Sequence, residues 1–175
     1  MVILEPVGTA LVLVDFMPRI MELSLGPRSG AEALDAACAL AERFRAVGAP
    51  VVAVKVDRPH AAEQPPGSEL HERVAALADE SVVKSTIGAF HRTGLHELLQ
   101  ERKVSTLVLA GIATNMGVES TARAASDYGY ELVFAEDAMT ALTSAEHQAA
   151  ITLNLPRFGQ VASSAELALK AASSS

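Results

Sequence analysis

The sequence predicts an α/β fold in which helices cover both faces of a parallel β-sheet. Segments with strand character and segments with helix character alternate along the chain, as they do in β-α-β units. The strand-like segments are apolar throughout, which is typical of strands that are buried on both faces. The chain has 175 residues, half of them hydrophobic, with no internal repeat and no linker. We therefore predict one domain that spans residues 1–175.

Short apolar segments bounded by polar or turn-forming residues predict the strands of this sheet. None of them approaches the roughly 20 residues that a membrane-spanning helix requires. The predicted strands are residues 10–15, 51–56, 82–84, 105–110 and 131–135, with a last short strand around Val161.

Capping signals predict the helices between the strands. Three segments have Ser or Thr followed three residues later by Glu, the capping-box pattern that satisfies the first backbone donors of a helix. Gly48 and Gly129 are expected to follow helix ends, and Pro156 must stop the helix before it. Residues 57–70, rich in Pro and polar groups, predict a surface loop. The predicted helices open near Ser29, Thr93, Val118, Thr143 and Ser163, and the last is a terminal helix.

The composition argues against several classes of function. A net charge of −7 and a pI near 5.2 disfavour a nucleic-acid partner, and 4% aromatic residues without Trp supply few stacking platforms. The first residues, MVILEPVGTA, lack the basic segment and long apolar run of a secretory signal. The single Cys38 fits a reducing compartment. We therefore expect a cytoplasmic homo-oligomer, a dimer or larger, that binds a small molecule and neither nucleic acid nor membrane.

The expected binding site lies at the carboxyl ends of the strands. In an open parallel sheet, ligands bind outside these ends, which all lie on one edge. Glu136 and Asp137 are expected at this edge because they follow the fifth predicted strand. The residues that the pattern places there are Asp15, Asp57, Lys84, the bend at 111–117, Glu136 and Asp137.

Asp15 and Lys84 place opposite charges at the ends of apolar strands. Either group is costly to bury there without a partner. One interpretation is a structural ion pair that ties two strand ends together. The other is a general acid or base whose pKa is set by partial burial and by the neighbouring cation. Two opposite charges at the ligand-binding edge favour the second interpretation.

The bend GIATNMGVES, residues 111–120, joins a predicted strand to a predicted helix. The first N–H groups of a helix lack intrahelical acceptors and lie at the positive end of its dipole, so they are able to hold a carboxylate or a developing oxyanion. The bend is neither a P-loop nor a dinucleotide fingerprint, since no GK[ST] follows it and no G-x-G-x-x-G occurs. A plain tight turn is the alternative interpretation of Gly117.

The remaining candidates carry weaker signals. The five histidines are scattered without the spacing of metal ligands, so no metal is expected. His91 follows Lys84 closely enough to line a pocket, and its alternative is a surface histidine. Cys38, among Ala and Leu in the first helix, is expected to pack in the core.

Three segments together resemble the isochorismatase-like, or cysteine hydrolase, superfamily. They are LVLVD ending at Asp15, VVKSTIGAF with Lys84, and LVLAGIATNMGVESTARAASDYGYELVFAEDAMTA, and the resemblance extends over residues 9–166. Members have a Rossmann-like, three-layer α-β-α fold with a six-stranded parallel sheet. Many hydrolyse amides with an Asp-Lys-Cys triad and have a cis peptide bond before the bend. The resemblance implies the same fold here and a cis peptide between Ile112 and Ala113.

Gly117 occupies the position at which these hydrolases have the catalytic cysteine. Without a thiolate there, the covalent acyl-enzyme route is closed. True isochorismatases also carry glycine, and in them the Asp protonates the enol carbon of a vinyl ether before water attacks. The resemblance implies that Asp15, Lys84 and Gly117 are catalytic and that Phe16, Phe90, His91, Ala113, Thr114, Asn115 and Met116 bind the substrate.

The first hypothesis is therefore a hydrolase that forms no covalent intermediate and needs no cofactor. Asp15 acts as the general acid, Lys84 orients it, and backbone N–H groups of the bend bind an oxygen of the substrate. A general acid needs a raised pKa, whereas Lys84 alone would lower the pKa of Asp15. Apolar neighbours such as Phe16, Met17 and Phe90 have to supply the opposing desolvation.

Two further hypotheses remain open from the sequence. One is a protein that binds a small acid but has lost catalysis, since Gly117 replaces the nucleophile. Thr86 and Met17 also differ from the Arg and Gln that isochorismatases tend to have at these positions. The other is an amidase with a substitute nucleophile, Thr114 or Ser120.

Overall fold

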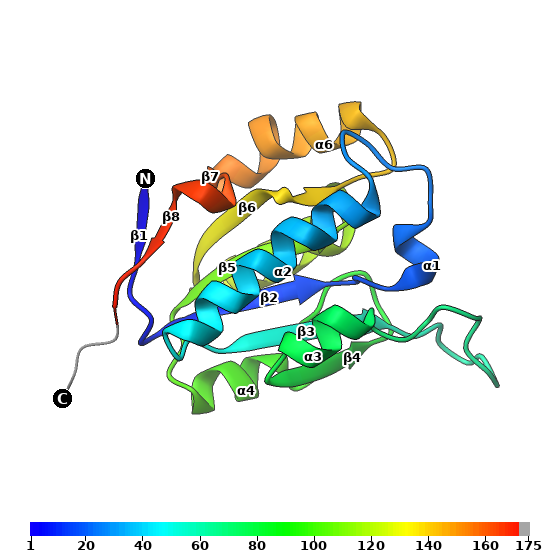
Figure 1. Ribbon diagram of the computed structural model, residues 1–175. Helices are drawn as coiled ribbons and strands as arrows, with labels where there is room; N and C mark the ends of the chain where they lie inside the picture. The colour runs from blue at the N-terminus through cyan, green and yellow to red at the C-terminus, as the bar shows by residue number, and fades with distance from the viewer. Residues whose placement is uncertain (172–175) are drawn as a thin grey trace.

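The computed structural model describes residues 1–171 and has the predicted three-layer α-β-α architecture (Figure 1). The strands of the central sheet are β2 (Thr9–Val14), β3 (Val51–Val56), β4 (Glu80–Lys84), β5 (Thr106–Ile112), β6 (Glu131–Thr140) and β7 (Gly159–Ala162). All of them pair in parallel, in the order β4-β3-β2-β5-β6-β7. The prediction of a six-stranded parallel sheet is thus confirmed.

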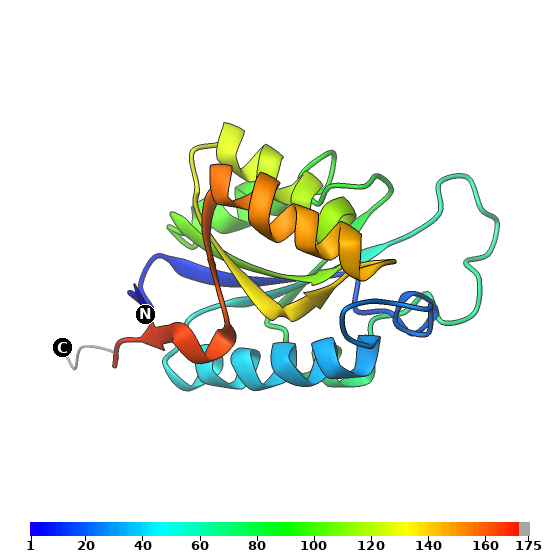
Figure 2. The same cartoon turned by 90° about the horizontal axis from the view of Figure 1, so that it is seen from above.

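Helices cover both faces of this sheet, as the view from above makes clear (Figure 2). Their bounds are α1 (Pro18–Met21), α2 (Gly30–Ala46), α3 (Glu72–Leu77), α4 (Leu95–Glu101), α5 (Glu119–Asp127) and α6 (Ser144–Ala149). The cores under α2 and α3 and under α4 and α5 form two separate clusters, one on each face. No helix of the described chain is long and apolar enough to cross a membrane.

The strand β2 explains why the strand segments are apolar at every position. Successive side chains of a strand point to opposite faces of the sheet. Leu11 and Leu13 belong to the cluster under α2, whereas Ala10, Val12 and Val14 belong to the cluster with α4 and α5. All six residues of β2 are buried, because neither face of the sheet meets solvent here.

The helix α2 begins and ends where its local sequence predicts. The Ser29 hydroxyl accepts a hydrogen bond from the backbone of Glu32 at 3.2 Å, and the Glu32 carboxylate accepts one from the Ser29 backbone at 2.8 Å. Gly48, with a φ of 74°, follows the last turn. The bounds of α2 therefore depend on local signals at both ends of the helix.

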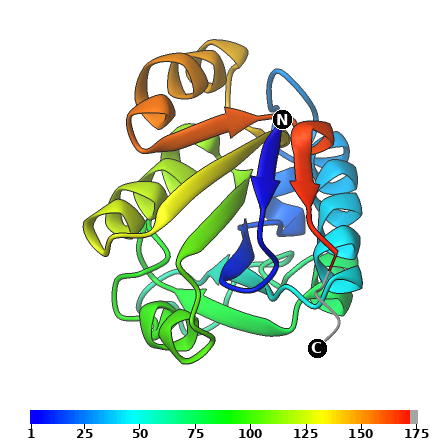
Figure 3. The same cartoon turned by 90° about the vertical axis from the view of Figure 1, so that its left-hand side faces the viewer.

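The prediction of a terminal helix after Ser163 is wrong. The capping box forms, but it opens only a 3₁₀ turn (Ser164–Glu166), and the chain continues as strand β8 (Leu167–Leu169). This strand pairs in parallel with β1 (Val2–Leu4), a strand that the sequence did not reveal, and the two lie side by side in Figure 3. Pairing between the two chain ends and burial of Leu167 override the local helix signal.

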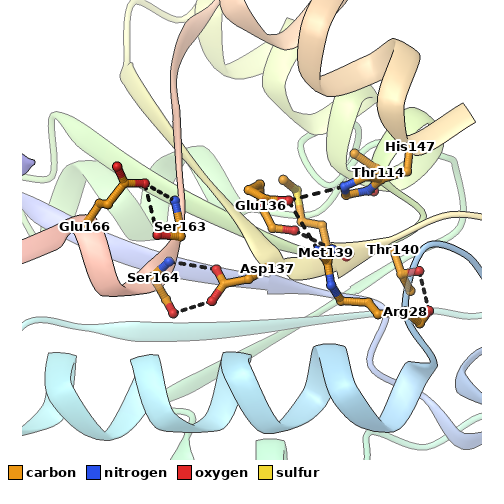
Figure 4. Close-up of polar contacts among 10 residues, drawn as sticks. All are labelled: Arg28, Thr114, Glu136, Asp137, Met139, Thr140, His147, Ser163, Ser164 and Glu166. Carbon is orange, nitrogen blue, oxygen red and sulfur yellow. Dashed lines mark hydrogen bonds and ion pairs between the residues drawn. The ribbon is translucent and has the colours of Figure 1, made fainter. Parts of the chain in front are cut away.

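The fifth predicted strand is longer than expected, and its extension corrects the placement of two acids. Leu109 of β5 pairs with Phe134, but Gly111 pairs with Met139, so β6 bulges between these partners. Glu136 and Asp137 lie within this bulge rather than after the strand. The Asp137 carboxylate accepts hydrogen bonds from the backbone N–H and the hydroxyl of Ser164 (Figure 4), so it anchors the C-terminal segment.

Two of the predicted helices are extended by irregular turns. A π-helical turn (Thr114–Val118) precedes α5, so the bend is already helical from Thr114 onwards. After α6 the chain continues as a π-helical turn (Ala150–Asn154) and a 3₁₀ turn (Leu155–Arg157) that contains Pro156. Regular helix therefore stops before the proline, as predicted.

Candidate functional site

The order of the strands creates a crevice at the carboxyl ends of β2 and β5. From β2 the chain builds outwards through β3 to β4, and then returns to the other side of β2 with β5. Ligands of such sheets bind at this switch point. Asp15 follows β2, the bend follows β5, and a cavity of about 380 Å³ lies between them. The cavity thus lies at the carboxyl ends of the strands, the edge at which the sequence predicts the binding site.

Asp15 and Lys84 form a buried ion pair at the floor of this crevice. The Lys84 Nζ lies 2.8 Å from Asp15 Oδ2, and the two residues are 2% and 5% exposed. Lys84 is the last residue of β4, so its side chain reaches past β3 to the end of β2. Asp15 has a φ of 57°, a left-handed conformation that few residues other than glycine adopt. The pair that the sequence suggested is therefore present, with little access to water.

The pKa of Asp15 is raised above its ordinary value of 3.8, because burial outweighs the opposing effects of Lys84 and of the more distant Arg19. Only Oδ2 contacts the ammonium group, while Oδ1 is buried and has no hydrogen-bond partner among the described residues. A proton on Oδ1 would relieve the burial of charge without breaking the contact to Lys84. Burial thus outweighs Lys84 in setting the pKa of Asp15, and it shifts that pKa in the direction that favours the protonated form.

Gly117 lies against this pair. A Cβ atom built on Gly117 would lie 3.1 Å from Asp15 Oδ2 and 3.4 Å from Lys84 Nζ. A side chain at this position would therefore point at both charged groups, and its absence leaves space above them. The predicted cis peptide between Ile112 and Ala113 is present, near the start of the bend.

Gly111 allows the bend to approach β2 closely. Its φ is 139°, and an added Cβ would lie 2.1 Å from the carbonyl oxygen of Val14. No other residue fits there without moving backbone. The first glycine of the bend is thus required by packing, whereas Gly117 opens space for a ligand.

The helical start of the bend supplies backbone donors close to the cavity. The N–H groups of the first helical turn have no intrahelical acceptors. In this turn the N–H of Met116 donates to the carbonyl of Ala113 at 3.0 Å. Gly117 of the same turn lines the cavity, so its N–H group is the candidate donor for a ligand.

The cavity brings together only part of the predicted set. Asp15, Lys84, Gly117, Ala113 and Met116 line it. The other wall residues were not in the predicted set of site residues, although Ile112 belongs to the predicted bend and Thr86 was noted as a departure from isochorismatases; most of them are aliphatic side chains that carry no signal for chemistry in a sequence. They are Ile20, Leu23, Leu25, Val56, Ser85, Thr86, Ile87, Ile112 and Leu142.

The other predicted binding residues lie outside the described cavity wall. Phe16 is fully buried in the core, and Phe90 packs against Tyr128, with ring centroids 5.3 Å apart. His91 is exposed on the surface. Asn115 and the fully buried Thr114 also do not line the cavity.

Thr114 belongs instead to a polar network behind the bend, which is drawn in Figure 4. Its hydroxyl lies 2.7 Å from His147 Nδ1, and His147 Nε2 is 3.5 Å from the Glu136 carboxylate. The Arg28 guanidinium contacts this carboxylate at 3.3 Å and donates to the carbonyl of Met139. The sequence did not connect these residues, because they come from four separate segments.

His147 is buried and held neutral. Burial lowers its pKa below the ordinary 6.5, the nearby Arg28 acts in the same direction, and Glu136 opposes them. The 3.5 Å contact to Glu136 is too long for a hydrogen bond, so Nε2 has no partner among the described residues. The network therefore joins α6 and β6 to the bend through one neutral imidazole.

The substitution His147→Gln is expected to change how stability depends on pH. The unfolded chain protonates this histidine near 6.5, whereas the native chain resists, so the wild type loses stability as the pH falls below 6.5. In the variant this contribution disappears, so the free energy of unfolding should decline less steeply than in the wild type as the pH falls. The two slopes should differ by up to about 1.4 kcal/mol per pH unit. Urea unfolding at about pH 7.5, 6.5 and 5.5 measures the slope.

The exposed His91 provides the matched control, because it lies outside the network. His91→Gln should leave the slope of the parent protein unchanged. A slope in His147→Gln that equals the slope of the parent would contradict a neutral, buried imidazole.

Within residues 1–171, no three His, Cys, Asp or Glu side chains lie close enough together to hold a metal ion. Cys38 is buried in α2, away from the cavity, as predicted.

Comparisons with known proteins agree with this fold. A sequence model of the isochorismatase domain matches residues 9–166. The isochorismatase family protein YecD of Escherichia coli O157:H7 is 39% identical over 176 residues, which cover 91% of this chain and 94% of that protein. A streptothricin hydrolase of Streptomyces noursei is 36% identical over 133 residues, 74% of this chain and 48% of that protein. The solved structure of an isochorismatase family protein from Burkholderia thailandensis superposes with a TM-score of 0.81 at 34% identity, over 94% of this chain and 95% of that one.

Proposed function

This chain belongs to the isochorismatase family, and we propose that it is a hydrolase of this family that cleaves a small enol ether without forming a covalent intermediate. Asp15 is the general acid. The observation that carries the proposal is the buried Asp15 carboxyl, whose pKa is raised although Lys84 lies 2.8 Å away. A carboxyl with a raised pKa at the edge of a cavity suits the general-acid step that enol-ether hydrolysis requires.

The reaction begins with transfer of the Asp15 proton to the enol carbon. The electron pair of the C=C bond forms the new C–H bond, and the ether oxygen shares the positive charge of the resulting oxocarbenium ion. Water then adds to the cationic carbon and loses a proton to the Asp15 carboxylate. The hemiacetal so formed collapses to a carbonyl compound and an alcohol. No step uses a side-chain nucleophile, so glycine at position 117 is compatible with it.

Lys84 and the bend have supporting roles in this proposal. After proton transfer, the Asp15 carboxylate is negative, and the Lys84 ammonium at 2.8 Å stabilises that charge. Gly117 leaves room for the substrate directly above the pair, because a Cβ there would come within 3.1 Å of Asp15 Oδ2. Backbone N–H groups of the first helical turn are available for an oxygen of the substrate.

Of the two substitute nucleophiles considered for an amidase, Thr114 is the one whose neighbours resemble those of a catalytic nucleophile. Its hydroxyl lies 2.7 Å from His147, and His147 lies near Glu136, which is the order of groups in a hydrolytic triad. However, Thr114 is fully buried and does not line the cavity. A substrate in the cavity does not reach it, so these contacts favour a structural role for the network.

The rate of hydrolysis is expected to fall as the pH rises. The active form carries a proton on Asp15, and this form is lost as the pH passes through a pKa that burial has raised above 3.8. The measurement is kcat/KM against pH for isochorismate and for phenyl vinyl ether, an uncharged enol ether. A rate that instead rises with pH through a pKa at or below 3.8 would show that the carboxylate, rather than the acid, is the active form. Binding without any conversion of either compound would favour the hypothesis of a non-catalytic binding protein.

A further inference from the structure

We infer that the ligand of the Asp15–Lys84 cavity is an uncharged and largely apolar small molecule rather than a carboxylic acid. The inference rests on the proposed function, since it names the class of substrate for the same site. It replaces the small acid that the sequence suggested. Three properties of the cavity carry it: the composition of the wall, the balance of its charges and the prior engagement of its polar groups.

Aliphatic side chains dominate the wall. Nine of the 14 residues that line the cavity are Ile, Leu, Val, Ala or Met. The apolar surface continues to the mouth, where Leu23, Ile87, Met116 and Leu142 are between 47% and 53% exposed. An apolar ligand would cover this surface and remove it from water, which favours binding. A highly hydrated ligand would gain nothing from these contacts.

The charges of the wall cancel each other. Asp15 and Lys84 are the charged residues among those that line the cavity, and they are paired at 2.8 Å. The next cation on this side, Arg19, does not line the cavity, and its guanidinium donates to the Ser68 hydroxyl and to the carbonyl of Val56. While Asp15 and Lys84 are paired as ions, a carboxylate that entered would lose water without meeting an unpaired cation, and such burial is unfavourable.

The polar groups of the wall are partly engaged as well. The Lys84 ammonium donates to the carbonyl of Ile87 in addition to its contact with Asp15. The Thr86 hydroxyl donates to the carbonyl of Gly88 at 3.1 Å. The wall thus offers a paired carboxyl and few free polar contacts, which suits an ether oxygen or a C=C bond better than a charged group.

One pair of probes tests the inference separately from catalysis. Phenetole is the saturated, unreactive analogue of phenyl vinyl ether, and 4-ethoxybenzoate is the same molecule with a carboxylate. The two dissociation constants are measured by ligand-observed NMR titration of the wild type near neutral pH. The dissociation constant of phenetole should be lower than that of 4-ethoxybenzoate by about 10-fold or more. Equal or tighter binding of 4-ethoxybenzoate would overturn the inference.

Variants at Thr86 locate the effect in the cavity. Thr86→Arg adds a cation to the wall and should strengthen binding of 4-ethoxybenzoate by about fivefold. Thr86→Gln has a similar reach without charge and should leave the preference for phenetole unchanged. Circular dichroism of both variants checks that they are folded. If arginine and glutamine change the preference equally, the selection against carboxylates does not arise in this cavity, and the inference fails.

Turnover of phenyl vinyl ether distinguishes this inference from the proposed function. Phenetole binding together with hydrolysis of phenyl vinyl ether to phenol and acetaldehyde supports both. Selective phenetole binding without hydrolysis removes the proposed activity and leaves the assignment of the ligand class standing. Hydrolysis of isochorismate with 4-ethoxybenzoate as the tighter probe supports the activity and overturns the ligand class.

Discussion

The substitution Asp15→Asn is expected to lower kcat/KM for enol-ether hydrolysis by about 10² to 10⁴-fold, the range that one positioned general acid contributes. Asparagine has the shape of the carboxyl group and is able to accept a hydrogen bond from Lys84, but it has no proton of suitable acidity to transfer. The effect should appear in kcat as well as in kcat/KM, because the lost interaction arises in the transition state.

Asp57→Asn is the matched control for this experiment. Asp57 follows β3 at the same edge of the sheet, but it does not line the cavity and lies 3.4 Å from Lys55. Its substitution should leave kcat/KM within about twofold of the wild type. Both variants should be compared at equal folded fraction, measured by urea unfolding. Full activity in Asp15→Asn would remove Asp15 from the mechanism.

The substitution Lys84→Met should produce the largest loss of stability. It leaves Asp15, which is 5% exposed, without its partner, and removal of one member of a buried ion pair typically costs about 3–5 kcal/mol. The loss should grow with pH. Without Lys84 the pKa of Asp15 rises further, so the native state retains a proton that the unfolded state releases near 3.8. Stability that is present at low pH is therefore lost as the pH rises through the raised pKa.

The double variant Asp15→Asn/Lys84→Met separates the ion pair from its two members. It removes both charges, so no unpaired ion remains, and it should be more stable than Lys84→Met at about pH 8. Urea unfolding of the wild type, both single variants and the double variant gives the coupling free energy. Simple addition of the two single effects would mean that the residues do not interact, against their 2.8 Å separation.

Much of the fold could be predicted, because its signals are local. The apolar strand segments, the capping box of Ser29 and Glu32 and the glycine that follows α2 each act within a few residues. The failures have the opposite character. The strand β8 depends on β1, which lies at the other end of the chain, and the bulge in β6 depends on its partner β5. A capping box at Ser163 did not reveal either contact.

The candidate site divides in the same way. Asp15 and Lys84 are recognisable as opposite charges at strand ends and Gly117 as a glycine of the bend, and the cavity brings them together. Phe90 and His91 are close to Lys84 in sequence, yet the chain turns them towards Tyr128 and the surface. Nearness along the chain does not specify which side of a loop a side chain occupies.

The sequence by itself determined the parallel sheet, the edge that carries the site and the absence of a thiol at position 117. These follow from hydrophobic pattern, turn chemistry and residue identity, all of which are readable along the chain. Only the tertiary structure decided that burial outweighs Lys84 at Asp15, that Thr114 pairs with His147, and that the cavity wall is apolar and balanced in charge. Desolvation and charge pairing depend on which side chains meet across the fold, because electrostatic interactions act through space and not along the sequence.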